Sequence, residues 1–128
     1  MQQDTATATR PALDIPNRLI ASNRVEGTAV YNRQGEKLGR IESFMVDKVS
    51  GRAEYAIMSF GGLFGLGEDH YPLPWDVLEY DPDKGGYVVD LDKERLKSGP
   101  RFRAGDEPAF DRDYGRAVYD YYGVIYTS

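Results

Sequence analysis

The chain has 128 residues, of which 16 are Lys or Arg, 21 are Asp or Glu and one is His, so its formal charge is −5. This length suits one domain, because a chain of about 100–150 residues builds one hydrophobic core rather than two. The acidic balance disfavours sequence-independent nucleic-acid binding and electrostatic binding to anionic membranes, since both need a basic surface. The absence of cysteine excludes disulfides, thiolate catalysis and Cys-ligated metal centres.

The first segment, residues 1–16, is small and polar and contains two prolines, which predicts a mobile N-terminal arm. Asp4 lies early in it, and no apolar core of a secretory signal follows. The longest uncharged stretch runs from Tyr55 to Gly67 and contains four glycines. It is too short for a membrane-spanning helix, which needs about 20 apolar residues. We therefore expect a cytoplasmic protein without membrane insertion.

Residues 17–100 are the predicted domain body, in which short apolar stretches alternate with turn residues. Asn32 and Gly35 suit the first and fourth positions of a type I turn with a bulge, and Gly39 suits a β-bulge in the next strand. Pro72 and Pro74, two residues apart, favour an edge strand or an extended connector. The expected strands cover residues 28–32, 38–48, 52–60, 70–75, 77–80 and 87–91. This pattern predicts a mainly β fold, a small barrel of five to six antiparallel strands.

Two helical segments are expected after the last strand. Residues 92–98 suit a short helix with Asp92 as its N-cap and Gly99-Pro100 as its stop. Residues 101–128 form a charged, Tyr-rich extension in which apolar residues from Phe110 onward recur at nearly helical spacing. A short helix is marginal in water, so this partly helical tail needs a surface to dock on. That surface is either its own barrel or the barrel of another subunit.

Several motifs resemble the PRC-barrel domain, which takes its name from the cytoplasmic part of the photosynthetic reaction centre H subunit. The run VYN…GEKLGRIE at 30–42 is similar to the opening hairpin of that domain. The middle and closing signatures of small bacterial members resemble SFGG at 59–62, GLG at 65–67, PLPW at 72–75, DLDKERL at 90–96 and YDYYG at 119–123. The resemblance implies the PRC-type barrel. Because known members are non-catalytic modules, it also implies a protein–protein interaction or assembly module rather than an enzyme.

The candidate interaction surface combines two groups of residues. One group is apolar and lies in the glycine-rich segment 61–67, where it either projects toward a partner or folds back onto one end of the barrel. The other group consists of tail tyrosines. The residues are Leu63, Phe64, Leu66, Tyr114, Tyr119, Tyr121 and Tyr122. We expect the partner to be another protein, and the protein itself to be a homodimer.

Other residue patterns favour structural roles. His70 is the single histidine, and a lone His without Cys makes a poor zinc site. The acidic pairs at 81–83 and 90–92 suit turn and helix-cap chemistry better than a calcium loop. No Gly-x-Ser-x-Gly motif occurs, so we expect no catalytic, cofactor-binding or metal-binding residue. The alternative function is a small-molecule or RNA/ribosome-associated binding barrel. It would use the barrel end near His70 and Trp75, and the basic residues of segment 95–103.

Overall fold

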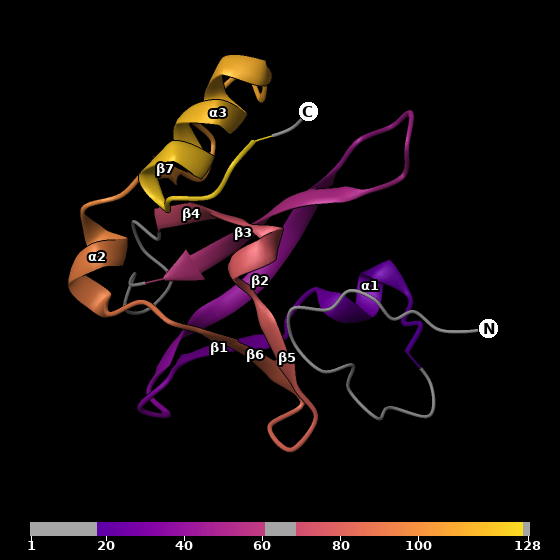
Figure 1. Cartoon of the computed structure of the whole chain (residues 1–128), viewed down its shortest axis with the longest axis vertical. Helices are drawn as coiled ribbons and strands as arrows, with labels where there is room; N and C mark the ends of the chain where they lie inside the picture. Colours follow the sequence, from indigo (N-terminus) through magenta and orange to yellow (C-terminus); the bar gives the residue numbers. More distant parts are fainter. Residues whose placement is uncertain (1–17, 61–68, 127–128) are drawn as a thin grey trace.

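The computed structural model describes residues 18–60 and 69–126, and the candidate residues Leu63, Phe64 and Leu66, like the N-terminal arm, lie outside them. Figure 1 shows one strongly curved sheet with α3 lying across one end of it. The elements in chain order are α1 (Ser22–Val25), β1 (Ala29–Asn32), β2 (Lys37–Val46), β3 (Ala53–Phe60), β4 (Asp69–Pro74), the 3-10 helix η3 (Trp75–Val77), β5 (Glu79–Asp81), β6 (Gly86–Val89), α2 (Lys93–Lys97), β7 (Phe102–Arg103) and α3 (Arg112–Tyr121).

The seven strands lie in the order β5-β6-β1-β2-β3-β4-β7. The expectation of a mainly β fold is confirmed, but two details of it were wrong. Among the described residues the sheet has seven strands rather than five or six, and β1 pairs with β6 in parallel. The extra strand, β7, has two residues and therefore no periodicity to detect, and the parallel pair joins segments far apart in the chain. Within the described residues no pairing of β5 with β7 closes the sheet.

Local signals placed most turns correctly. Asn32 accepts hydrogen bonds at Oδ1 from the backbone N–H groups of Gln34 and Glu36, and Gly35 has a φ of 86°, as the predicted turn requires. A register shift between Val30 and Tyr31, opposite Gly39, confirms the predicted bulge. These features hold the β1–β2 hairpin in its observed register.

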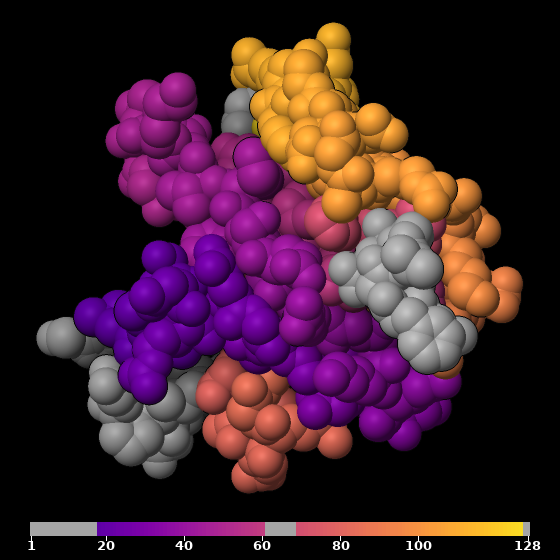
Figure 2. Space-filling model, turned by 180° about the vertical axis from the view of Figure 1, so that it is seen from behind, coloured from indigo at the N-terminus to yellow at the C-terminus, as the bar shows by residue number. Residues whose placement is uncertain are grey.

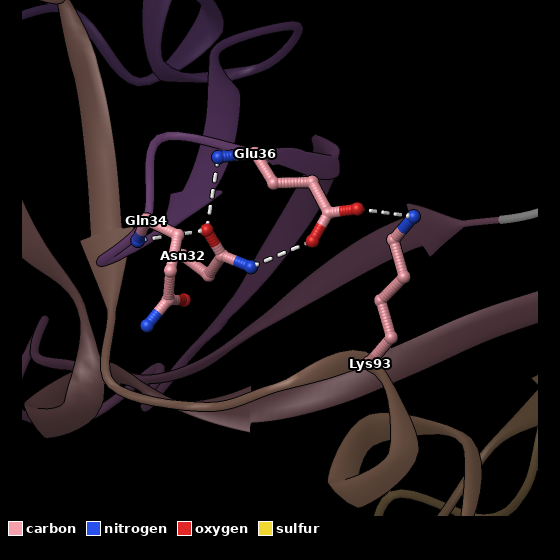
Figure 3. A network of polar contacts seen from close by, with 4 residues as sticks. All are labelled: Asn32, Gln34, Glu36 and Lys93. Atoms are coloured by element: carbon pink, nitrogen blue, oxygen red, sulfur yellow. Dashed lines mark hydrogen bonds and ion pairs between the residues drawn. The ribbon is translucent and has the colours of Figure 1, made fainter.

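A polar network ties this hairpin turn to the start of α2 (Figure 3). The Asn32 side chain is buried, and its Nδ2 donates to Glu36 Oε1 at 2.9 Å. Lys93 Nζ lies 2.7 Å from Glu36 Oε2. The bond from Lys93, followed by the bond from Asn32, lowers the pKa of the Glu36 carboxyl below its usual value. The network thus joins two segments that are more than 50 residues apart in sequence.

The strand β4 has an edge character where it carries its two prolines. The strand β7 pairs only with Asp69 and His70, whereas Pro72 and Pro74 pair with β3 alone. This confirms the edge-strand reading for that half of β4. The helix α3 packs against β4, so the proline-bearing edge is covered by a helix instead of another strand.

The hydrophobic core is shared by the sheet and by both later helices. Fully buried residues include Ile41, Met58 and Leu73 from the sheet, Leu96 from α2 and Val118 from α3. The helix α3 therefore completes the core of its own sheet, which answers for this structure the question of where the tail docks. In residues 18–60 and 69–126, no helix has the length and apolar composition needed to cross a membrane.

Candidate functional site

The helix α3 begins and ends with sequence-encoded caps. Asp111 Oδ1 accepts a hydrogen bond from the Tyr114 backbone N–H at 2.9 Å, which satisfies one of the unpaired N–H groups of the first turn. Gly123, with a φ of 72°, follows the last turn and allows the chain to reverse direction. The returning segment, residues 123–126, then runs back along α3, so that Tyr126 lies against the helix at Gly115.

Glu54 of β3 anchors both α3 and the returning segment. The Tyr119 hydroxyl donates to the Glu54 backbone carbonyl, and the Tyr126 hydroxyl donates to Glu54 Oε1 at 3.0 Å. The two rings lie 4.8 Å apart between their centroids. Gly115 leaves room for this contact, because a β-carbon at that position would lie 2.6 Å from the Tyr126 hydroxyl oxygen and the Tyr126 side chain would have to shift.

Arg95 of α2 holds the C-terminal end of α3. It donates from Nη2 to the Tyr121 carbonyl at 2.6 Å, and the Tyr121 hydroxyl donates back to the Arg95 carbonyl at 2.6 Å. The guanidinium carbon lies 4.9 Å from the centroid of the Tyr121 ring, a cation–π arrangement. Gly99 leaves room for the pair, since a β-carbon there would lie within 3.0 Å of both Tyr121 and Tyr122.

The N-terminal half of α3 packs through an aromatic cluster. Phe110 and Tyr114 both contact the Tyr55 ring of β3, with centroid distances of 6.4 and 6.3 Å. In the described part of the chain, the buried hydroxyls of Tyr114 and Tyr122 have no hydrogen-bond partner. The cluster is therefore held by ring packing more than by hydrogen bonds.

The four candidate tyrosines all face inward to different degrees. Tyr119 and Tyr122 are buried, and Tyr114 and Tyr121 are half-buried. In this arrangement they form the contacts by which α3 packs against the rest of the chain, and they offer little surface to another molecule. Their assignment to an interaction surface, with that of the three residues in segment 61–68, stays a prediction.

A shallow groove lies on the outer side of the helix. It has a volume of about 390 Å³ and is lined by Arg116, Asp120 and residues 123–126. Ile125 in this lining is 83% exposed. Sequence reasoning missed the groove because it forms only when the chain reverses at Gly123. The one signal in the sequence was the opposite charges of Arg116 and Asp120, which are four residues apart and therefore lie on the same face of the predicted helix.

The β2–β3 hairpin contributes two further exposed apolar residues. Val49 at its tip is 93% exposed and Val46 is 48% exposed. Val46 pairs with Ala53, which is adjacent to Glu54, the residue that holds Tyr126. Figures 1 and 2 show this hairpin projecting from the body of the molecule on the side where the C-terminal segment ends. The hairpin and the C-terminal segment, which carry these exposed apolar residues, thus lie toward one end of the protein.

Comparison with known proteins identifies the scaffold that carries this site. A family model described as the PRC-barrel domain matches residues 18–96, more than half of the chain. The chain belongs to the PRC-barrel domain family. An uncharacterized protein of Deinococcus radiodurans is 30% identical over 78 residues, which make up 61% of this chain and 27% of that protein. The chain thus spans little more than a quarter of that relative, and β7 and α3 lie beyond the region that matches the family model.

The residues expected to serve a binding barrel do not converge in this PRC-barrel protein. His70 contacts the Phe102 ring, with centroids 5.5 Å apart, and Trp75 contacts Phe44 and Tyr87. The two residues lie at opposite ends of β4, roughly 17 Å apart at the usual rise per residue of a strand. They therefore do not line a single ligand site.

Two of the four basic residues of segment 95–103 are engaged within the PRC-barrel protein itself. Arg95 is stacked on Tyr121, and Arg101 donates to the Lys97 carbonyl at 2.5 Å and lies 3.6 Å from the Asp69 carboxylate. Such guanidiniums are poorly placed to neutralise RNA phosphates.

The acidic pairs serve the turns and caps that the sequence predicted. Asp81 Oδ1 accepts from the backbone N–H of Asp83 at 2.9 Å, and Asp92 Oδ1 caps α2 by accepting from the Arg95 N–H at 2.8 Å. Within residues 18–60 and 69–126, no group of three or more His, Asp or Glu side chains is arranged to hold a metal ion.

The buried tyrosines predict unfolding at alkaline pH. Burial raises the pKa of Tyr119 from 10.0 to about 12, and it also raises the pKa of Tyr55 and Tyr122. Above pH 10 the unfolded chain loses protons that the folded chain keeps, so the free energy of unfolding is unaffected below pH 10 and falls as the pH rises toward 12. We expect tyrosinate absorbance to appear together with the loss of circular dichroism. Complete ionisation near pH 10 with unchanged dichroism would contradict this account.

Proposed function

We propose that this PRC-barrel protein is a non-catalytic module that acts by binding other proteins. The observation that carries the proposal is the exposure of three apolar residues, Val46 and Val49 of the β2–β3 hairpin and Ile125 of the C-terminal segment. Single exposed apolar residues are common on proteins, but three at one end, two of them more than four-fifths exposed, favour a contact site. We call these three residues the apolar end.

The scaffold behind the apolar end supports this role. Tyr126 is held through Glu54 and through packing on Tyr119 and Gly115, so the neighbouring Ile125 projects from an ordered segment. Val46 is the last residue of a ten-residue strand that pairs along most of its length with β3. A surface presented by such fixed elements loses little conformational entropy when it binds.

The test is capture of partners from the native cell with matched surface variants. We expect Ile125→Asp and Val49→Asp to remove proteins that co-purify with the tagged wild-type chain, because an aspartate cannot be buried in an apolar contact without a partner charge. The control is Leu19→Asp, the same kind of change at a residue that is 88% exposed near α1. Circular dichroism checks that all three variants remain folded.

Two results would speak against the proposal. One is an unchanged set of captured proteins for both variants of the apolar end. The other is equal loss of partners with Leu19→Asp, which would show a general effect of added negative charge.

A further inference from the structure

The outer face of α3 carries an unusual arrangement of charges. Arg116, Ala117 and Asp120 are all exposed there. Within the described residues, no salt bridge joins Arg116 and Asp120 to each other or to another residue. Their order, with the cation on the N-terminal side of the anion, is the weaker orientation for an i, i+4 pair within one helix. The two charges are thus available to a group outside the chain.

Asp120 is also poorly placed with respect to the helix itself. It lies in the last turn of α3, where the exposed carbonyl groups give the helix end a partial negative charge. The last turn of α3 contains no basic residue of its own, and the Arg95 guanidinium at this helix end bonds the Tyr121 carbonyl and forms no ion pair with Asp120. A cation supplied from outside would therefore offset the unfavourable interaction of the Asp120 carboxylate with the helix end.

We propose that the outer face of α3 binds the same face of a second copy of this chain, with the two helices antiparallel. A two-fold axis midway between residues 116 and 120 places Arg116 of each copy opposite Asp120 of the other. Both ion pairs form at once because the patch is complementary to itself, which is the property a two-fold dimer needs. Parallel packing would instead oppose like charges, so the charge order selects the antiparallel arrangement. This inference rests on the proposed interaction role and names one partner for it.

The rest of the helix face is compatible with close approach. Ala117, between the two charged residues, has a side chain small enough for two helices to pack at about 8–10 Å between their axes. The exposed charged residues of α3 are Arg112, Asp113, Arg116 and Asp120, so the face is neutral although the chain carries −5. Two copies therefore meet through a part of the surface that does not add to their overall repulsion.

The small area of this helix face limits the expected affinity of the dimer. A helix of ten residues is about 15 Å long, which is short for the roughly 800 Å² per partner of a stable complex. We expect a weak dimer with a dissociation constant on the order of 10–100 µM. Added salt should weaken it further, since exposed ion pairs are screened.

Sedimentation velocity over a concentration series tests the proposal with charge-reversal variants. We expect wild type to dimerise, and Arg116→Asp and Asp120→Arg each to weaken self-association about tenfold or more, because each replaces two attractions with two repulsions. The double variant Arg116→Asp/Asp120→Arg should dimerise again, since its patch is once more complementary to itself. An equimolar mixture of the two single variants should form a heterodimer.

The outcomes separate this inference from the proposed function. Wild type that stays monomeric at concentrations about tenfold above the expected dissociation constant, or Arg116→Asp that dimerises as wild type does, overturns the α3 dimer. If native partners are still captured through the apolar end in that case, the interaction role stands without it. If the dimer behaves as expected but Ile125→Asp and Val49→Asp capture the same partners as wild type, the proposed surface of the apolar end fails instead.

Discussion

Gly39→Ala is expected to leave little folded protein, although it adds a single methyl group. A β-carbon at this position would lie 2.0 Å from the Ser59 carbonyl oxygen and 3.1 Å from Met58 Cγ. The oxygen belongs to the backbone of β3, so no rotamer change can relieve the clash, and the β2–β3 pairing must open. We expect the free energy of unfolding to fall by about 4 kcal/mol or more, which is as large as the effect of the most damaging single substitutions. It is also a large part of the total stability of a small domain.

Gly35→Ala is the matched control for this substitution. Gly35 has a φ of 86°, and a β-carbon there would meet nothing within 4 Å. Its replacement costs only the strain of an alanine in the left-handed region, about 1–2 kcal/mol. Urea unfolding followed by circular dichroism measures both variants. If both variants lose the same free energy of unfolding, then backbone conformation, and not the close approach of β2 and β3, explains the requirement for Gly39.

Tyr119→Ala is the second substitution with a large expected effect, because it removes the central anchor of α3. Tyr119 is 7% exposed, packs on the Tyr126 ring and donates to the Glu54 carbonyl. We expect a loss of about 3–5 kcal/mol, as for other buried aromatic residues cut back to alanine. Tyr119→Phe keeps the ring but leaves the carbonyl without its donor, and should cost about 1–3 kcal/mol.

Urea unfolding and limited proteolysis of the C-terminal segment together measure the effect. Tyr80→Ala serves as control, since Tyr80 is an aromatic residue on an edge strand with 37% of its surface exposed. Equal destabilisation by Tyr80→Ala and Tyr119→Ala, or unchanged proteolysis of residues 110–126 in Tyr119→Ala, would mean that docking of α3 contributes little to stability.

Features set by neighbouring residues were predictable from the sequence. The Asn32–Gly35 turn, the bulge at Gly39 and the Asp92 cap each depend on a side chain or a φ angle within four residues of the backbone group concerned. The amphipathic spacing of the tail also predicted a helix that needs a docking surface, and α3 is that helix. The motifs along residues 30–96 were sufficient to indicate the family, whose model matches residues 18–96.

The candidate site could be predicted only in part from the sequence. The tail tyrosines were recognised as important, but whether each ring faces the sheet or solvent depends on how α3 is rotated against β3 and β4. Contact with Glu54 and Arg95 settles that rotation, and both residues lie far from the tail in sequence. The groove beside Arg116 and Asp120 needs the further reversal of the chain after Gly123.

Composition, charge and local motifs in this chain were sufficient for the class of fold, the family, the turns and the caps, because each reflects short-range backbone preferences or an unbroken run of residues. The parallel pairing of β1 with β6, the two-residue β7 and the docking of α3 on its own sheet appear only in the tertiary structure. They depend on contacts between segments separated by tens of residues. These contacts are stabilised by the burial of apolar side chains such as Leu96 and Val118 in one shared core. The backbone preference of a short stretch of sequence does not indicate which distant segments will be buried together.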